Sequence, residues 1–154
     1  MIATRIAKAI AFRAAALSDA DACVRVVAGA GDDLPGLVID RFGGFVVASD
    51  YDPAGPGAAL LPIIEAALPG CAVVVRARSG KDGLQFHFGE RPAPESLIAV
   101  EDGLKFEIRT DPRHDFGLFL DGRTARARPG LSPACPRLVP GLFPAEPTSP
   151  AADG

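Results

Sequence analysis

Apolar side chains recur at helical spacing at the start of the chain. Ile6, Ile10 and Leu17 share one face, and Ser18 interrupts the pattern. Apolar positions that return every three to four residues are typical of an amphipathic helix. The pattern therefore predicts a helix over residues 4–17 that turns its basic side chains towards solvent.

Beyond this helix the apolar pattern takes the period of two that is typical of strands. β-branched and aromatic residues gather in runs that we expect to form strands: 23–28 (CVRVVA), 37–42 (LVIDRF), 45–50 (FVVASD), 71–78 (CAVVVRAR) and 84–89 (LQFHFG). Gly43 and Gly44 separate the second run from the third, and a two-residue glycine link of this kind closes a hairpin.

The segment 56–70 (PGAALLPIIEAALPG) has the composition of a helix but contains Pro62. A proline in a helix interior removes a backbone hydrogen bond and costs about 3 kcal/mol. The sequence leaves two alternatives, a helix that begins near Pro62 and a helix that is kinked there.

A second hairpin is predicted over residues 97–109 (LIAVEDGLKFEIR), where Asp102 and Gly103 form a type I′ turn signature between two alternating runs. Taken in order, the elements predict an α+β fold. It consists of an N-terminal helix, a small mixed or antiparallel sheet with one or two helices, and a proline-rich irregular C-terminal tail.

The tail is marked by its prolines, seven of the fifteen in the chain lying between residues 129 and 150. Prolines at this density exclude helix and most sheet, and the segment has too few apolar residues for a core of its own. We therefore expect four parts along the chain: an N-terminal helix (1–19), a small α+β domain (20–110), a short segment (111–126) and a disordered tail (127–154).

Composition narrows the class of protein. Apolar residues make up 48% of the chain, and the net charge is −3, which leaves room for a local basic patch but not for a strongly basic nucleic-acid module. The three cysteines, at positions 23, 71 and 135, form no CxxC pair and fit packed thiols in a reducing compartment. Basic residues interrupt the N-terminal apolar positions, and no apolar stretch approaches the ~20 residues of a membrane span. These features predict a cytoplasmic protein without a membrane partner.

Between Arg25 and Gly43 the chain carries a motif, RVVAGAGDDLPGLVIDRFG. It resembles the pattern R-V-x-x-G-E-G-D-x-L-P-G-L-x-V-D-R-(Y/F)-G of the class I S-adenosylmethionine-dependent methyltransferases of the large-subunit ribosomal RNA type, and the cytosine-C5 group is the most similar. The matching residues are Arg25, Val26, Gly29, Gly31, Asp32, Leu34, Pro35, Gly36, Leu37, Asp40, Arg41, Phe42 and Gly43.

A second motif of the same family reads E-N-G-L-x-F, followed by K-T-G-F-F-L-D-Q-R-x-N-R. The chain agrees at Glu101, Gly103, Leu104, Phe106, Gly117, Phe119, Leu120, Asp121, Arg123 and Arg126. It departs from the pattern at His114-Asp115 in place of Lys-Thr, and Gly122 and Ala125 replace Gln and Asn. By resemblance, Phe119, Asp121 and Arg123 are contacts to S-adenosylmethionine, ribosomal RNA is the partner, and no catalytic residue or metal ligand is assigned.

The resemblance covers about residues 5–126 and implies that a Rossmann-like catalytic domain would follow. It also implies that residues 20–110 are an accessory domain on the substrate side and that residues 111–126 are the entry segment to the catalytic domain. No strand, glycine-rich loop and helix follow residue 126, and the glycines at 29–31 and 55–57 lack the third glycine of a cofactor cradle. We therefore expect a truncated member of the family that neither binds S-adenosylmethionine nor transfers methyl groups by itself.

An alternative is a stand-alone, non-catalytic module that binds RNA or a partner protein through the small sheet. Its signal would be aromatic and basic residues interleaved on one strand face, for which the sequence offers Phe86, Phe88, Lys105 and Phe106. A missing domain would also expose an apolar face around Phe116–Phe119 (Phe116, Leu118 and Phe119) and favour self-association.

Two further sites have simpler interpretations. We expect Asp40 and Arg41 to form structural ion pairs near the end of a hairpin. His87 alternates with Phe86 and Phe88 and is expected on the solvent side of the sheet, without a partner at metal-ligand spacing.

Overall fold

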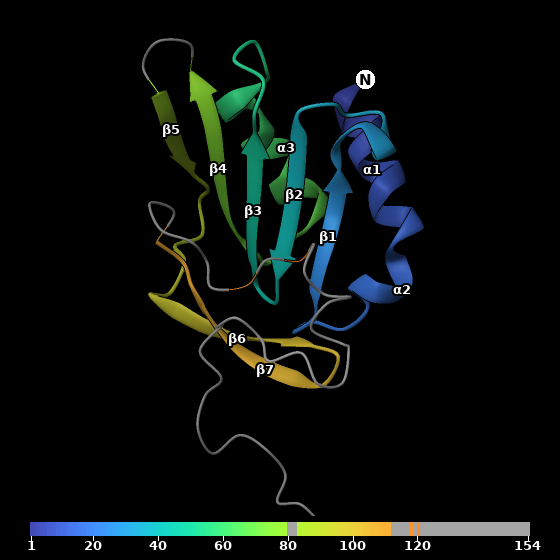
Figure 1. Ribbon diagram of the computed structural model, residues 1–154, viewed down its shortest axis with the longest axis vertical. Coiled ribbons are helices and arrows are strands. Elements are labelled where there is room, and N and C mark those ends of the chain that lie inside the picture. The colour runs from blue at the N-terminus through green and yellow to red at the C-terminus, as the bar shows by residue number, and fades with distance from the viewer. Residues whose placement is uncertain (80–82, 112–117, 119, 121–154) are drawn as a thin grey trace, which may run out of the picture.

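The computed structural model describes residues 1–79, 83–111, 118 and 120, and its elements are labelled in Figure 1. The helices are α1 (Ile2–Phe12), α2 (Ala14–Leu17) and α3 (Leu60–Ala67), with 3₁₀ turns η1 (Gly29–Asp32) and η2 (Gly57–Ala59). The strands are β1 (Cys23–Ala28), β2 (Leu37–Phe42), β3 (Phe45–Asp50), β4 (Ala72–Ser79), β5 (Gly83–Phe88), β6 (Ser96–Glu101) and β7 (Leu104–Arg109). This mixture of helices and sheets confirms the predicted α+β class.

The strands β1 to β5 form one sheet in chain order, and β6 and β7 form a second sheet. Neighbouring strands of the larger sheet are antiparallel except β3 and β4, which run parallel and are joined through η2 and α3. Parallel neighbours need such a crossover because a tight turn can only reverse the chain direction. The larger sheet is therefore mixed, which is one of the two arrangements that the sequence left open.

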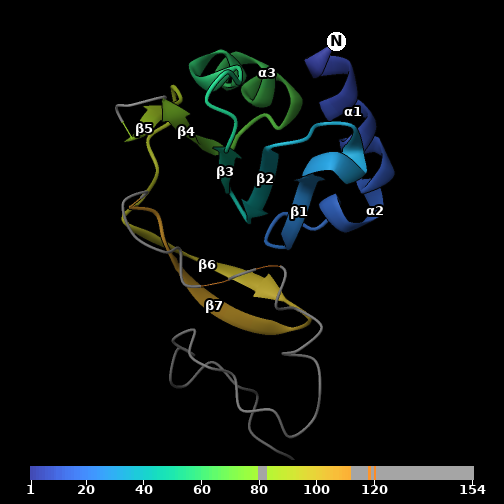
Figure 2. The same cartoon turned by 45° about the horizontal axis from the view of Figure 1, so that its top comes forward.

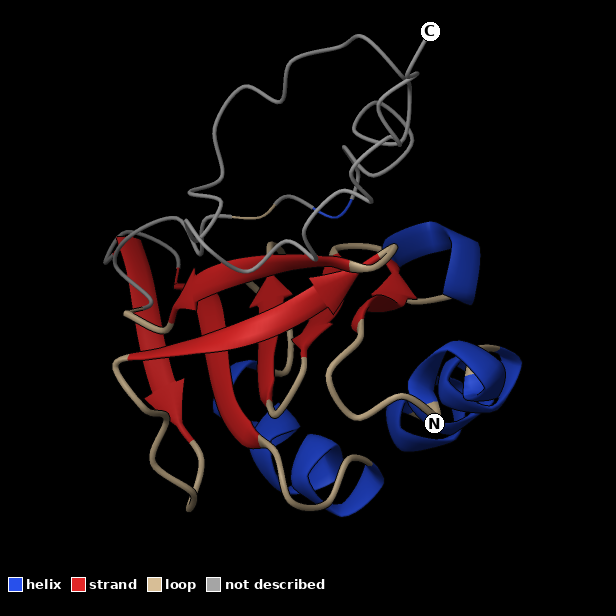
Figure 3. Cartoon of the chain, turned by 90° about the horizontal axis from the view of Figure 1, so that it is seen from below, coloured by secondary structure: helices blue, strands red, loops and turns tan. Residues whose placement is uncertain are grey.

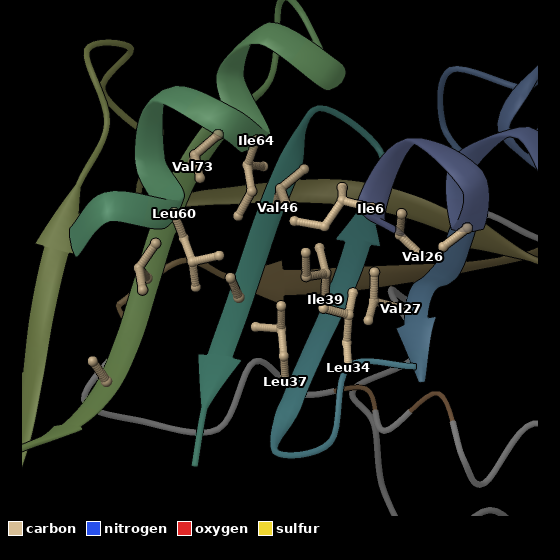
Figure 4. Close-up of a cluster of buried hydrophobic side chains, with 14 residues drawn as sticks. Ile6, Val26, Val27, Leu34, Leu37, Ile39, Val46, Leu60, Ile64 and Val73 are labelled. Atoms are coloured by element: carbon tan, nitrogen blue, oxygen red, sulfur yellow. The ribbon is translucent and has the colours of Figure 1, made fainter. Parts of the chain in front are cut away.

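The two faces of the larger sheet are covered differently. The helices α1 and α3 lie on one face (Figures 1 and 3), where Ile6, Leu60 and Ile64 pack against Val26 and Val73 (Figure 4). The β6–β7 hairpin crosses the other face at one end of the sheet only (Figure 2). One end of this second face is therefore buried beneath the hairpin, while no helix or strand of the described residues covers the other end.

The N-terminal helix ends earlier than predicted. Instead of one helix over residues 4–17, α1 stops at Phe12, and Arg13 separates it from α2 with φ −104° and ψ 15°. The Arg13 guanidinium donates to Ala9 O and makes a bidentate ion pair with Asp32, with N–O distances of 3.0 and 2.9 Å. The periodicity of the apolar residues carries no information about this ion pair, because its two residues are 19 positions apart in the sequence.

Asp32 also accepts a hydrogen bond from the Ala28 backbone N–H, at 2.7 Å. Burial raises the pKa of Asp32, but the hydrogen bonds from Arg13 and Ala28 and the charges of Arg13 and Lys8 outweigh burial and lower the pKa overall. A carboxyl with a lowered native-state pKa stabilises the fold when it is ionised, and this stabilisation is lost as the pH falls through the native-state pKa.

We expect Asp32→Asn to lower the free energy of unfolding by about 1–2 kcal/mol at neutral pH, because the charge-assisted bonds are weakened. The deficit relative to the wild type should shrink as the pH falls below about 5, where the wild type loses the same interaction. Urea unfolding at several pH values measures this. Asp33→Asn is the matched control, since Asp33 is exposed with φ 57° and asparagine tolerates that conformation. An Asp32→Asn deficit that is independent of pH would contradict the assignment.

Pro62 does not kink α3, because the helix begins at Leu60 and places the proline in its first turn. The first N–H groups of a helix have no partner within the helix, so a residue that lacks an N–H is tolerated there. Of the two alternatives that the sequence left, the helix that begins near Pro62 is therefore correct.

Both predicted hairpins are confirmed. The strands β2 and β3 meet around Gly43, which has φ 56°, and β6 and β7 meet at Asp102 and Gly103, which have φ values of 51° and 79°. Two successive positive φ values define the type I′ turn that the sequence indicated. The prolines of the predicted tail (127–154) lie outside the described residues.

Candidate functional site

The residues that resemblance assigned to the cofactor, Phe119, Asp121 and Arg123, lie outside the described residues. Within the same motif the structure describes Leu118 and Leu120. Leu118 is buried in the cluster between the β6–β7 hairpin and the larger sheet, and Leu120 packs against that cluster. The expected exposed face around Phe116–Phe119 is therefore wrong at Leu118, whose apolar side chain is already covered by this chain; Phe116 lies outside the described residues.

The most polar part of the first motif supports the fold. Asp40 forms the expected ion pair, with the Arg25 guanidinium at 2.8 and 3.1 Å on the neighbouring strand. Arg41 is 8% exposed and instead donates to the backbone oxygens of Gly43, Leu17 and Ala20, at 2.8, 2.9 and 2.7 Å. Arg41 thus links the end of α2 and the segment that follows it to the end of β2. The presence of Arg41 in the motif is therefore explained by its role in the fold.

The two glycine-containing segments are filled by the chain itself. Gly29 and Gly31 lie in η1 between antiparallel strands, which is not the strand, loop and helix arrangement of a cofactor cradle. Gly55 packs so closely on the Asp50 carboxylate that a Cβ there would collide with it. Asp50 is buried and accepts hydrogen bonds from the N–H groups of Asp52 and Gly57, at 3.2 and 2.9 Å. Neither segment fits the methyl donor.

Residues 1–79, 83–111, 118 and 120 give little support for a reactive thiol or a metal site. Cys23 is buried in the hairpin-side cluster and Cys71 packs at the edge of the helix-side cluster, as expected of structural thiols. Within the same residues, no three His, Cys, Asp or Glu side chains are grouped closely enough to hold a metal ion. Cys135 lies outside the part that the structure describes.

One surface gathers aromatic and basic side chains, namely the end of the sheet face that the β6–β7 hairpin leaves uncovered. We call it the open face and define it by Val38, Ser49, Tyr51, Arg76, Arg78, Leu84, Phe86 and Phe88. Val73 and Val75 of β4 point into the helix-side core, so the alternating Arg76 and Arg78 lie on the opposite face. Phe88, Tyr51 and Leu84 are 62%, 53% and 44% exposed.

The strand register brings these side chains together in rows. Arg76 lies opposite Phe86, and Arg78 lies opposite Leu84, because β4 and β5 are antiparallel. Directly opposed residues of such a pair project from the same face with Cβ atoms about 5 Å apart. The Arg78 guanidinium also stands over the Tyr51 ring, 5.8 Å from its centroid. Rings and guanidinium groups therefore alternate across the open face.

The aromatic and basic set that the sequence proposed is partly wrong. Phe106 is 2% exposed and points into the hairpin-side core, and Lys105 alternates with it on the outer face of the hairpin. His87 lies opposite Val75 on the helix side of the sheet and is half-buried, so the residues on the open face are its neighbours Phe86 and Phe88. The alternation R-A-R in β4 and F-H-F in β5 could have indicated this site from the sequence. The sequence does not show, however, that the arginines and the phenylalanines share a face, because that depends on how the two strands pair.

An open pocket of about 560 Å³ adjoins the open face at Phe88. It lies between the end of β5, the segment that leads to β6, and the end of β7, and is lined by Val74, Phe88, Gly89, Glu90, Pro92, Ala93, Pro94, Glu95, Thr110 and Asp111. Its three carboxylates make this end of the surface acidic, whereas the cations of the open face lie further along β4.

No family model matches the chain. Curated proteins do match in sequence, among them three ribosomal RNA large subunit methyltransferases I. The protein of Escherichia coli O127:H6 is 33% identical over 114 residues, that of Erwinia tasmaniensis is 33% identical over 115 residues, and that of Cronobacter sakazakii is 34% identical over 114 residues. Each alignment covers 66% of this chain and 28% of the relative. The chain thus spans less than a third of the length of the curated relatives it matches.

Solved structures share the fold. A protein from Streptococcus mutans assigned to the S-adenosylmethionine-dependent methyltransferases superposes with a TM-score of 0.63 at 19% identity, over 80% of this chain and 33% of the other. A second methyltransferase structure, determined as a complex with SAH, gives 0.60 at 20% identity, over 80% and 34%. The chain is therefore similar in sequence to a segment of the large-subunit ribosomal RNA methyltransferases I, and in fold to a segment of S-adenosylmethionine-dependent methyltransferases.

Proposed function

We propose that this chain serves S-adenosylmethionine-dependent methylation of large-subunit ribosomal RNA at a cytosine C5, as the domain that meets the RNA. The observation that carries the proposal is the 33% identity over 114 residues to ribosomal RNA large subunit methyltransferase I. The predicted division of labour, with an accessory domain over 20–110 and an entry segment over 111–126, is part of the proposal, as is a cytoplasmic location alongside the ribosomal RNA. Among the described residues no helix is both long and apolar enough to cross a membrane.

The two glycine-containing segments do not fit the methyl donor, since the Asp50 carboxylate occupies the loop that follows β3 and the η1 glycines lie between antiparallel strands. S-adenosylmethionine supplies an electrophilic methyl group when it is bound. The role of the described residues would be to hold and orient the RNA, a contribution that converts a bimolecular reaction into a positioned one. We therefore propose that the 154-residue chain does not transfer methyl groups by itself.

Two measurements test the proposal. Deletion of the gene should remove one 5-methylcytidine from the large-subunit ribosomal RNA, as measured by mass spectrometry of nuclease digests, and re-expression should restore it. Calorimetry of the purified chain with S-adenosylmethionine should show no binding in the micromolar range. Unchanged methylation in the deletion strain would contradict the proposed reaction, and micromolar binding would contradict the assignment of the donor site outside this chain.

The same experiment separates the alternative, a non-catalytic module that binds RNA or a partner protein. The exposed rings of Phe88 and Tyr51 and the exposed Arg78 on the open face favour an RNA-binding role. A deletion strain with unchanged methylation, together with a chain that still binds ribosomal RNA, would establish the alternative instead.

A further inference from the structure

We propose that a single-stranded RNA segment binds to the open face, with bases stacked on Phe86 and Phe88 and phosphates held by Arg78. This inference rests on the proposed function for its choice of RNA as the ligand. It goes further by assigning the surface, the strandedness of the RNA and the role of each side chain.

The rings form a platform for bases. Phe86 and Phe88 are two residues apart on β5 and project from the same face, so they are separated by about 7 Å. Successive bases of a duplex rise by only about 3.4 Å along each strand. Two neighbouring bases that rest on the two rings are therefore unstacked from each other, which a single strand permits and a duplex does not. Base stacking on aromatic side chains is worth about 1–3 kcal/mol per base and accepts any base.

The guanidinium groups lie beside the rings on the same face. Arg76 lies directly opposite Phe86, and Arg78 is exposed beside Tyr51. The remaining charges in these rows, Arg25 and Asp40, are paired with each other at 2.8 Å. Arg78 therefore places an exposed positive charge on the open face, although the whole chain carries a net charge of −3. A local positive surface on an acidic protein directs a polyanion to one place.

The acidic pocket beside Phe88 sets the position of the RNA backbone. Glu90 and Glu95 would repel phosphates, whereas carboxylates accept hydrogen bonds from the exocyclic amino group of cytosine. Phosphates consequently lie over Arg78, and the base on Phe88 turns its edge towards the pocket. A partner protein with an apolar surface would have to cover Arg76 in the row of Phe86 and Arg78 in the row of Leu84. RNA therefore fits the face better than such a protein does.

Fluorescence anisotropy with the whole 154-residue chain tests the inference. The probes are a labelled single-stranded 10-mer RNA of mixed sequence and the duplex that it forms with its complement. Phe88→Leu removes a ring but keeps an exposed apolar side chain, and Arg78→Gln removes a charge. The matched controls are Phe12→Leu, an exposed ring on α1, and Lys105→Gln, an exposed cation on the outer face of the hairpin.

The wild type should bind the single strand at least tenfold more tightly than the duplex. Phe88→Leu should weaken binding by about fivefold or more at every salt concentration, because stacking involves no ion release. Arg78→Gln should weaken binding and make the slope of log K against log salt shallower by about 0.7, the value for one phosphate contact on a single strand. Both controls should leave affinity and slope unchanged.

Equal affinity for duplex and single strand, no measurable binding by the wild type, or equal losses in Phe12→Leu and Phe88→Leu would each overturn the inference. These outcomes are distinguishable from failure of the proposed function. Loss of the 5-methylcytidine in the deletion strain tests the reaction, and it does not depend on whether the variants bind the 10-mer.

Discussion

Phe106→Ala is expected to lower the free energy of unfolding by about 3–5 kcal/mol, the range for removing a buried phenylalanine ring. Phe106 is 2% exposed and belongs to the cluster in which Phe42 and Phe45 of the larger sheet meet the β6–β7 hairpin. Domains of this size are stable by about 5–15 kcal/mol, so the variant loses a large part of its stability. Urea unfolding followed by circular dichroism measures the loss.

Lys105→Ala provides the matched control, because Lys105 is the neighbouring residue of β7 and is exposed. A surface substitution of this kind should change the free energy of unfolding by no more than about 0.5 kcal/mol. A loss below about 1 kcal/mol in Phe106→Ala would mean that the hairpin is not part of the cooperative core.

Arg41→Met is expected to cost about 3 kcal/mol, the second-largest loss. Methionine has a similar length but no donors, and it leaves the backbone oxygens of Leu17, Ala20 and Gly43 without the guanidinium. Hydrogen bonds to charged groups contribute about 1.5–3 kcal/mol each, and buried acceptors that lose their donor incur a desolvation penalty. Solvent that reaches the vacated oxygens keeps the total below the sum of the three bonds.

Arg25→Met removes an arginine of the same motif and serves as the control. Its ion pair with Asp40 is partly exposed, and such pairs are worth about 0–1 kcal/mol. Arg41→Lys should recover little, because a single ammonium group cannot replace the planar fork of donors. Equal losses for Arg25→Met and Arg41→Met in urea unfolding would contradict the structural role given to Arg41.

The local elements were predictable because their signals are local. The alternating runs and the Asp102-Gly103 turn gave the correct strands and hairpin, and of the two alternatives that Pro62 left, the helix that begins near it is the one observed. The break at Arg13 was missed, and the side chain at the break is bonded to Asp32, a residue in another element. Amphipathic periodicity reports only which side of a helix is buried, and it carries no information on distant ion pairs.

Only part of the candidate site could be predicted from the sequence, because the rest depends on contacts between different strands. Phe86 and Phe88 were recognised, but the cations beside them are Arg76 and Arg78 rather than Lys105. An alternating strand tells which residues share a face within that strand, whereas the register between strands decides which side chains of different strands meet. The motif residue Arg41 shows the converse case, in which a polar residue expected to form an ion pair binds the backbone of a distant loop.

The β6–β7 hairpin lies across one end of the sheet, and this position gives the adjoining surface a polarity. Any extended molecule that lies along β4 and β5 meets the hairpin as a steric stop at one end, whereas no helix or strand of the described residues covers the other end. Its termini are therefore not equivalent, and the surface distinguishes a ligand from the same ligand turned end for end.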